Sequence, residues 1–115
     1  MYTQTYADGR LFSWDRRKSD VNLADRGFDF EFASSIFSGL TLEREDTRQD
    51  YGERRMIAMG SADGILIVVV YTDRVLSGGR IERRLISARR ASKRERVAYE
   101  TAIEGKVSQS RPRGP

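Results

Sequence analysis

The run ILIVVVY at residues 65–71 constrains the fold of this 115-residue chain more than any other feature. Its consecutive apolar and aromatic residues, rich in β-branched side chains, favour a strand that is covered on both faces. The run is far shorter than the roughly 20 residues that a helix needs to cross a bilayer. It therefore predicts the central strand of a small sheet, and no membrane association is expected.

Two further strands are predicted beside this run. RRMIAMG at 54–60 precedes it, and the intervening SADG has a composition suited to a hairpin turn. RVLSGG then leads into RIERRLISA at 80–88. Alternation along that strand places Ile81 and Leu85 on one face, and Arg84 together with Ile86 on the other.

A short strand and a helix are predicted near the N-terminus. RLFSW at 10–14 contains the apolar and aromatic residues that favour a pleated surface. Asp15 is a suitable N-cap for a helix over 16–26. Gly27 stands where a glycine with positive φ ends such a helix.

Two more helices complete the predicted fold. Asp29 caps a shorter helix that Gly39 ends, and its apolar residues fall at helical spacing: Phe30, Ala33 and Phe37. A final helix is expected over 92–104 with Gly105 as its end, and its candidate buried residues are Val97, Tyr99 and Ile103.

The order of these elements defines the predicted fold class. Strand, two helices, three strands and a helix make an α+β fold, in which a small antiparallel sheet of about four strands packs against helices. The length suits a single domain, which we place at 1–105. The basic tail at 106–115 is expected to be disordered.

The residue types that are missing restrict the chemistry. The chain has no cysteine and no histidine, so thiolate nucleophiles, imidazole bases and metal sites built from these residues are excluded. We expect neither a metal nor a cofactor. The opening MYTQTYADGR lacks the apolar stretch of a signal peptide, which favours a cytoplasmic protein.

Charge is unevenly distributed along the chain. Residues 1–73 carry 9 cations and 13 acids, whereas residues 74–115 carry 12 cations and 4 acids. Cations are densest in RLISARRASKRER at 84–96, between the last strand and the last helix. Such a segment attracts polyanions, most often nucleic acid, although an exposed basic surface without a partner explains the composition equally well.

A series of short motifs runs from about residue 12 to about residue 100. They are SWD at 13–15, Lys18, Asn22, Gly27, FDFEFA at 28–33, IF at 36–37, YGERR at 51–55, Gly60, VVVYT at 68–72, LISAR at 85–89 and ERVAY at 95–99. In order and spacing the series resembles the BrnT family of toxins from bacterial toxin–antitoxin pairs.

The resemblance implies a fold and a function. The family resembles RelE-type ribonucleases, in which a small sheet packed against helices cleaves mRNA and inhibits translation, with the ribosome helping in some members. It also implies a cognate antitoxin with a DNA-binding ribbon-helix-helix portion. The antitoxin would cover the active surface, and the complex would bind operator DNA through the antitoxin.

Three positions depart from the family pattern. Arg26 stands where many members have a histidine before the helix-ending glycine. Met56 replaces an aromatic residue, and Arg54 replaces the second acid of the preceding motif. If that histidine acts in the chemistry, the reaction in this chain is weakened or proceeds differently.

Three arginines are the candidate catalytic residues. RNA cleavage without a metal needs a group that stabilises the extra negative charge on the phosphate, and the guanidinium fork does this well. We assign this role to Arg55, Arg84 and Arg89; the alternative roles are an ion pair for Arg55, a surface strand cation for Arg84 and a solvated helix start for Arg89. The side chains able to move protons are Glu53, Tyr71, Lys93 and Tyr99.

Further residues are candidates for substrate binding: Trp14, Lys18, Arg26, Lys93 and Arg94. The two α-helical cations at 93 and 94 would attract phosphate without regard to sequence, or form an ordinary exposed helix surface. Trp14 would stack on a base, although a single tryptophan beside a helix start is more often part of the core.

Two hypotheses of function follow from the sequence. The first is an endoribonuclease toxin that stops growth by cutting mRNA. The alternative is a non-catalytic module that binds only an antitoxin or a nucleic acid, because the family histidine is missing. A third, weaker possibility is a structural partner whose basic surface merely matches an acidic antitoxin.

Overall fold

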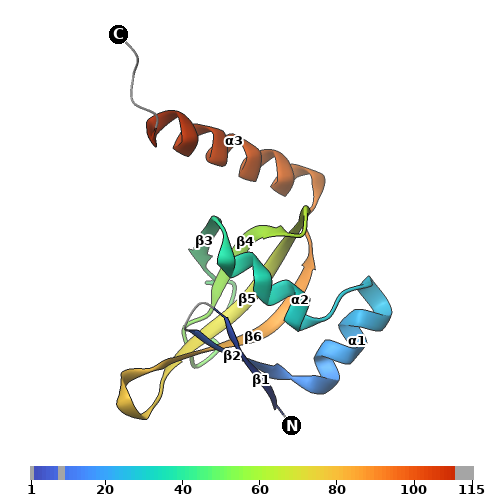
Figure 1. The fold of residues 1–115 in the computed structure, drawn as a ribbon, viewed down its shortest axis with the longest axis vertical. Helices are drawn as coiled ribbons and strands as arrows, with labels where there is room; N and C mark the ends of the chain where they lie inside the picture. Colours follow the sequence, from blue (N-terminus) through green and yellow to red (C-terminus); the bar gives the residue numbers. More distant parts are fainter. Residues whose placement is uncertain (1, 8–9, 111–115) are drawn as a thin grey trace.

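The computed structural model describes the backbone of residues 2–7 and 10–110, and the side chains of residues 10–105 (Figure 1). It shows an α+β fold, as predicted. The elements in chain order are β1 (Tyr2–Ala7), β2 (Arg10–Asp15), α1 (Arg16–Arg26), α2 (Phe30–Ser34), the 3-10 helix η1 (Ser35–Ser38), β3 (Thr41–Glu45), β4 (Met56–Ala62), β5 (Ile65–Val75), the 3-10 turn η2 (Ser77–Gly79), β6 (Ile81–Arg90) and α3 (Lys93–Ser110).

The strands form one sheet in the order β1-β2-β6-β5-β4-β3. This sheet has six strands in the described residues, against about four predicted, because the edge strands β1 and β3 are too polar to be recognised from their sequence. It is also mixed: β2 pairs with β6 in parallel, while the other pairings are antiparallel. The chain between β2 and β6 supplies the helices that a parallel pairing requires.

The predicted helix ends near the N-terminus are confirmed. The Asp15 carboxylate accepts hydrogen bonds from the backbone N–H groups of Arg17, at 2.9 Å, and Lys18, at 3.2 Å. Gly27 ends α1 at φ +86°, and its N–H donates to the Leu23 carbonyl. Asp29 caps α2 through a 2.8 Å hydrogen bond from the Phe32 N–H.

The strand β5 is the centre of the core, as the apolar run predicted. Ile67, Val69 and Tyr71 face the side of the sheet on which α2 and η1 pack, where the core also contains Phe12, Trp14, Phe30, Ile36, Leu85 and Ala88. Val68 and Val70 face the opposite side and are buried as well. Both faces of β5 are therefore covered.

One end of the helix-covered face is closed by a buried arginine. The Arg83 guanidinium lies 4.0 Å from the centre of the Tyr71 ring and 4.7 Å from that of Phe37. Two 2.8 Å hydrogen bonds join it to the Asp73 carboxylate. Stacking between the two rings and bidentate pairing compensate for removing this charge from water.

The C-terminal helix α3 projects away from the sheet (Figure 1). It continues through Gly105 to Ser110, so the predicted end at Gly105 is wrong. Val97, predicted to be buried, is 55% exposed, whereas the other two candidates, Tyr99 and Ile103, are half-buried. Of the tail that was expected to be disordered, residues 111–115 lie outside the described part of the chain.

No helix in the described ranges is long and apolar enough to cross a membrane.

The packing of η1 on β4 leads to a stability prediction for Gly60. A Cβ atom at this position would lie 3.0 Å from the Ile36 Cβ and 3.1 Å from the Thr41 Cγ2. We expect Gly60→Ala to lower the free energy of unfolding in urea by about 1–3 kcal/mol, as overpacking does elsewhere. Gly105→Ala, on the open surface of α3, is the control and should not destabilise the protein; equal stability of the two variants would contradict the close packing.

Candidate nucleic-acid interface

A β-bulge in β6 sets the positions of two candidate arginines. Val70 pairs with Ser87 and Tyr71 pairs with Leu85, so Ile86 is an extra residue without a partner on β5. Strict alternation would place residues 84 and 89 on opposite faces. With the bulge, Arg84 pairs with Thr72 and Arg89 with Val68, which share one face of β5.

The bulge makes one prediction about the faces of β6 wrong. Arg84 was expected to share its face with Ile86, but it shares that face with Ser87 and Arg89 instead. The register shift is a property of the β5–β6 pairing, and nothing in the sequence of β6 alone marks it.

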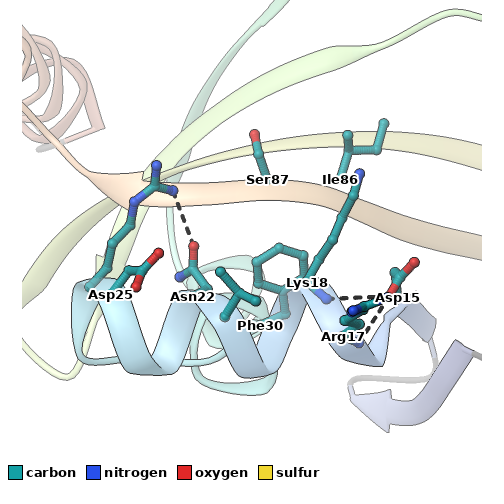
Figure 2. Close-up of a pocket in the computed structure, with 10 residues that line it drawn as sticks. Asp15, Arg17, Lys18, Asn22, Asp25, Phe30, Ile86 and Ser87 are labelled. Carbon is teal, nitrogen blue, oxygen red and sulfur yellow. Dashed lines mark hydrogen bonds between the residues drawn. The ribbon is translucent and has the colours of Figure 1, made fainter.

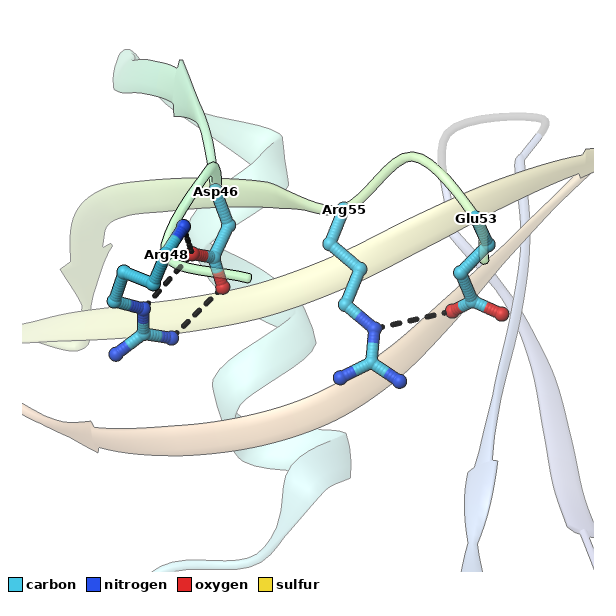
Figure 3. A network of polar contacts seen from close by, with 4 residues as sticks. All are labelled: Asp46, Arg48, Glu53 and Arg55. Carbon is cyan, nitrogen blue, oxygen red and sulfur yellow. Dashed lines mark hydrogen bonds and ion pairs between the residues drawn. The ribbon is translucent and has the colours of Figure 1, made fainter. Parts of the chain in front are cut away.

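The loop over residues 46–55 lies against the same face of the sheet. The Thr72 hydroxyl donates a 2.8 Å hydrogen bond to the Arg54 carbonyl, which places the loop next to Arg84 in the register. Figure 3 shows Arg48 and Arg55 extending from this loop in front of β5 and β6, with α2 on the far side of the sheet. We call the surface formed by Arg48, Arg55, Arg84 and Arg89 the arginine face.

Three arginines of this face are held by carboxylates. Arg55 Nε lies 3.2 Å from Glu53, and its guanidinium stacks 4.2 Å from the centre of the Tyr51 ring. Arg48 forms two 2.8 Å hydrogen bonds to Asp46, which hold the pKa of that carboxyl well below its usual range. The ion pair suggested as the alternative role of Arg55 is therefore present.

The third carboxylate connects Arg89 to the last helix. Arg89 donates hydrogen bonds of 2.7 and 2.9 Å to the two Glu95 oxygens. The Glu95 carboxylate also accepts from the Ser92 N–H, while the Ser92 hydroxyl accepts from the Glu95 N–H, which is a capping box. The Arg89 guanidinium lowers the pKa of Glu95 to about 2, and the hydrogen bonds to Glu95 raise the pKa of Arg89.

A buried polar group lies beside Arg84. Ser13 of β2 pairs with Arg84, which pairs on its other side with Thr72, so the three side chains form one row across the sheet. Ser13 is 2% exposed, and its hydroxyl has no hydrogen-bond partner in the part of the chain described. Buried hydroxyls usually have a partner, so this unpartnered atom next to Arg84 is an exception.

Lys18 and Arg26 line a groove of about 560 Å³ between α1 and β6, which borders the arginine face at Ser87 (Figure 2). We call it the α1–β6 groove, and its lining includes Lys18, Val21, Asn22, Arg26, Ile86 and Ser87. Arg26 donates to the Ala88 carbonyl at 2.7 Å and to the Asn22 side-chain oxygen at 3.1 Å. At this position the side chain fastens α1 to β6.

The remaining substrate-binding candidates differ in exposure. Trp14 is 3% exposed and belongs to the core, so its ring has no free face on which a base could stack. Lys93 and Arg94 are exposed at the start of α3. There they are close in sequence to Arg89 and add positive charge beside the arginine face.

The structure separates the candidates for proton transfer. Burial and a hydrogen bond to Glu43 raise the pKa of Tyr71, whose ring lies on the helix-covered face. Burial also raises the pKa of Tyr99, which donates to the Leu40 carbonyl. Glu53, by contrast, contacts an arginine of the arginine face.

Arg48 was not predicted as a site residue. It lies in a polar stretch without secondary structure, so only the path of the loop places its charge near Arg89. Among the described residues, no group of three or more acidic side chains is arranged to hold a metal ion.

The sheet face opposite α2 and η1 carries arginines from a loop and a strand, and such a surface is suited to binding polyanions. The model of the BrnT family, described as ribonuclease toxins of type II toxin–antitoxin systems, matches residues 14–95. A search of curated proteins finds no match to the chain. Because the family match covers most of the sequence, the protein belongs to the BrnT family, and this membership implies an antitoxin partner.

The Arg89–Glu95 pair leads to a prediction about titration. A carboxyl with a lowered pKa stabilises the folded state above its ordinary pKa of 4.5, and this stabilisation is lost as the pH falls towards the folded value of about 2. Carbon NMR of the Glu95 carboxyl should give a midpoint near 2 in the wild type and a clearly higher one in Arg89→Ala. Arg90→Ala is the control; a midpoint unchanged by Arg89→Ala would show that the pair does not form in solution.

Proposed function

We propose that this protein is a metal-independent endoribonuclease toxin that cleaves mRNA in the cytoplasm and thereby inhibits translation. The observation that carries the proposal is the shared face of Arg84 and Arg89, produced by the bulge at Ile86, with Arg55 on the loop above it. Family membership supports the substrate class.

The proposed chemistry uses charge and position. When the 2′-hydroxyl of RNA attacks the adjacent phosphate, the phosphate gains negative charge before the 5′-oxygen leaves. Fixed guanidinium groups stabilise that charge, and each can donate two parallel hydrogen bonds to phosphate oxygens. Arg84, in the centre of the face beside the unpartnered Ser13 hydroxyl, is our candidate for the principal phosphate contact.

The carboxylate partners of the other arginines are compatible with this role. Glu53 and Glu95 hold Arg55 and Arg89 at the surface by ion pairs that lie partly in water, whereas the Asp46 carboxylate that pairs with Arg48 is buried. Exposed pairs of this kind contribute only about 0–1 kcal/mol. A phosphate can therefore displace a carboxylate and take over its hydrogen bonds at little cost.

The missing histidine is the basis of the alternative, a non-catalytic binding module. The contacts of Arg26 argue against giving this position a chemical role, because its side chain donates to a backbone carbonyl of β6 and not to a group on the arginine face. A protonated imidazole nitrogen could donate in the same manner. The replacement therefore keeps a structural contact.

The partner that we propose is a ribbon-helix-helix antitoxin that covers the arginine face and links the complex to operator DNA. The implied antitoxin supports this proposal. An acidic segment of the partner would form ion pairs with the same arginines that bind RNA.

The central prediction concerns Arg84. Expression of the wild type without antitoxin should arrest bacterial growth, and the purified protein should cleave single-stranded RNA in the presence of EDTA. Arg84→Ala should restore growth and lower the cleavage rate by about 100-fold or more, the usual loss when one donor to the transition state is removed.

Arg80→Ala is the matched control, because it removes one exposed arginine at the far end of β5 and β6. It should remain toxic. Normal growth with soluble wild-type protein, or equal cleavage by the two variants, would refute the proposed function or the role of Arg84, respectively.

A second prediction tests the role of Arg26. Arg26→Ala leaves the Ala88 carbonyl, at a buried residue, without its donor. It should therefore lower the free energy of unfolding by about 1–3 kcal/mol. At a temperature where the variant is fully folded, and with saturating RNA, it should cleave RNA at the wild-type rate per folded molecule. A folded variant that is inactive would show that position 26 takes part in the chemistry.

A further inference from the structure

We propose that the α1–β6 groove is a subsite for one nucleotide of the RNA strand that crosses the arginine face. This inference rests on the proposed function and extends it from a surface that holds phosphate to one that also holds a base. It assigns a role to a groove of about 560 Å³ that lies beside the arginine face.

The groove is continuous with the arginine face through Ser87. Ser87 lines the groove and pairs with Val70, so it shares its sheet face with Arg84 and Arg89 and stands between them along β6. The unpaired Ile86 stands next to it on the groove wall. A strand held by the two arginines therefore passes the mouth of the groove.

The lining suits a nucleotide. Val21 and Ile86, which are at least partly exposed, provide apolar surface for a base, and the volume of about 560 Å³ is that of a small-ligand site. Lys18 extends from α1 towards Ile86 (Figure 2). Among the described residues the Lys18 ammonium has no carboxylate within ion-pair distance, and the acid whose charge it acts on is Asp15.

The phosphate contact must come from Lys18 and not from the start of α1. The backbone N–H groups of Arg17 and Lys18 are already bonded to the Asp15 carboxylate, which also repels an anion at that point. Lys18 lies in the first turn of α1, opposite Ile86 of β6, and we place the base between this strand and the helix. Asp15 and Asp25 also line the groove, so the phosphate of a bound nucleotide must lie at Lys18 and its base at Val21 and Ile86.

Two residues of α1 provide a matched test. Val21 and Leu23 are 52% and 50% exposed, but only Val21 lines the groove. Val21→Glu and Leu23→Glu therefore add the same charge to the same helix, one inside the groove and one outside it. With a single-stranded RNA whose 2′-O-methyl groups prevent cleavage, fluorescence anisotropy should show binding weakened about tenfold or more by Val21→Glu and little changed by Leu23→Glu.

A crosslinking experiment locates the base directly. The full-length protein bound to the same RNA carrying 4-thiouridine at successive positions should crosslink at one position to the segment 16–26 or to residues 86–87. Crosslinks confined to α3 or to the loop over 46–55 would overturn the subsite.

The outcomes separate this inference from the proposed function. If the wild type cleaves RNA while Val21→Glu and Leu23→Glu bind it equally, the subsite is wrong and the ribonuclease assignment stands. If the wild type neither binds nor cleaves RNA, both are wrong. If Val21→Glu weakens only the complex with the antitoxin, the groove belongs to the protein partner and the inference fails.

Discussion

The pairing of β5 with β6 is the interaction on which the rest of the structure depends. It joins the most apolar strand to the most basic one, so the same ladder builds the core and presents the arginines. Leu85 and Ala88 both face the helices, although they are three residues apart and regular alternation would place them on opposite faces. The extra residue Ile86 lies between them and reverses the alternation, so that the core residues share one face and Arg84 and Arg89 share the other.

The arginine face is stabilised in the free protein by its own carboxylates. Arg89 illustrates the arrangement, because Glu95 both caps α3 and pairs with this arginine. One side chain thus fixes the start of a helix that otherwise projects into solvent. A phosphate that takes Arg89 from Glu95 would leave the capping box intact, so RNA binding need not unfold the helix.

The position of the family histidine shows how a departure from a motif can be accommodated. Arg26 is longer than histidine, yet it reaches the Ala88 carbonyl and is steadied by Asn22. Asn22 in turn donates to the Phe28 carbonyl, just after α1 ends. The end of α1, the following turn and the edge of β6 are therefore held by one small network, to which Arg26 contributes two hydrogen bonds.

The sequence by itself determined the local structure: the central strand, the ends of the first two helices and the motifs of the family. The apolar run 65–71 required a central strand, Asp15, Gly27 and Asp29 fixed helix ends through their own backbone preferences, and the motif series identified the family. Tertiary structure alone decided the parallel pairing of β2 with β6, the edge strands, the burial of Trp14 and the shared face of Arg84 and Arg89. The physical reason is that a strand's register depends on its partner: a bulge is a relation between two strands, and neither sequence contains it by itself.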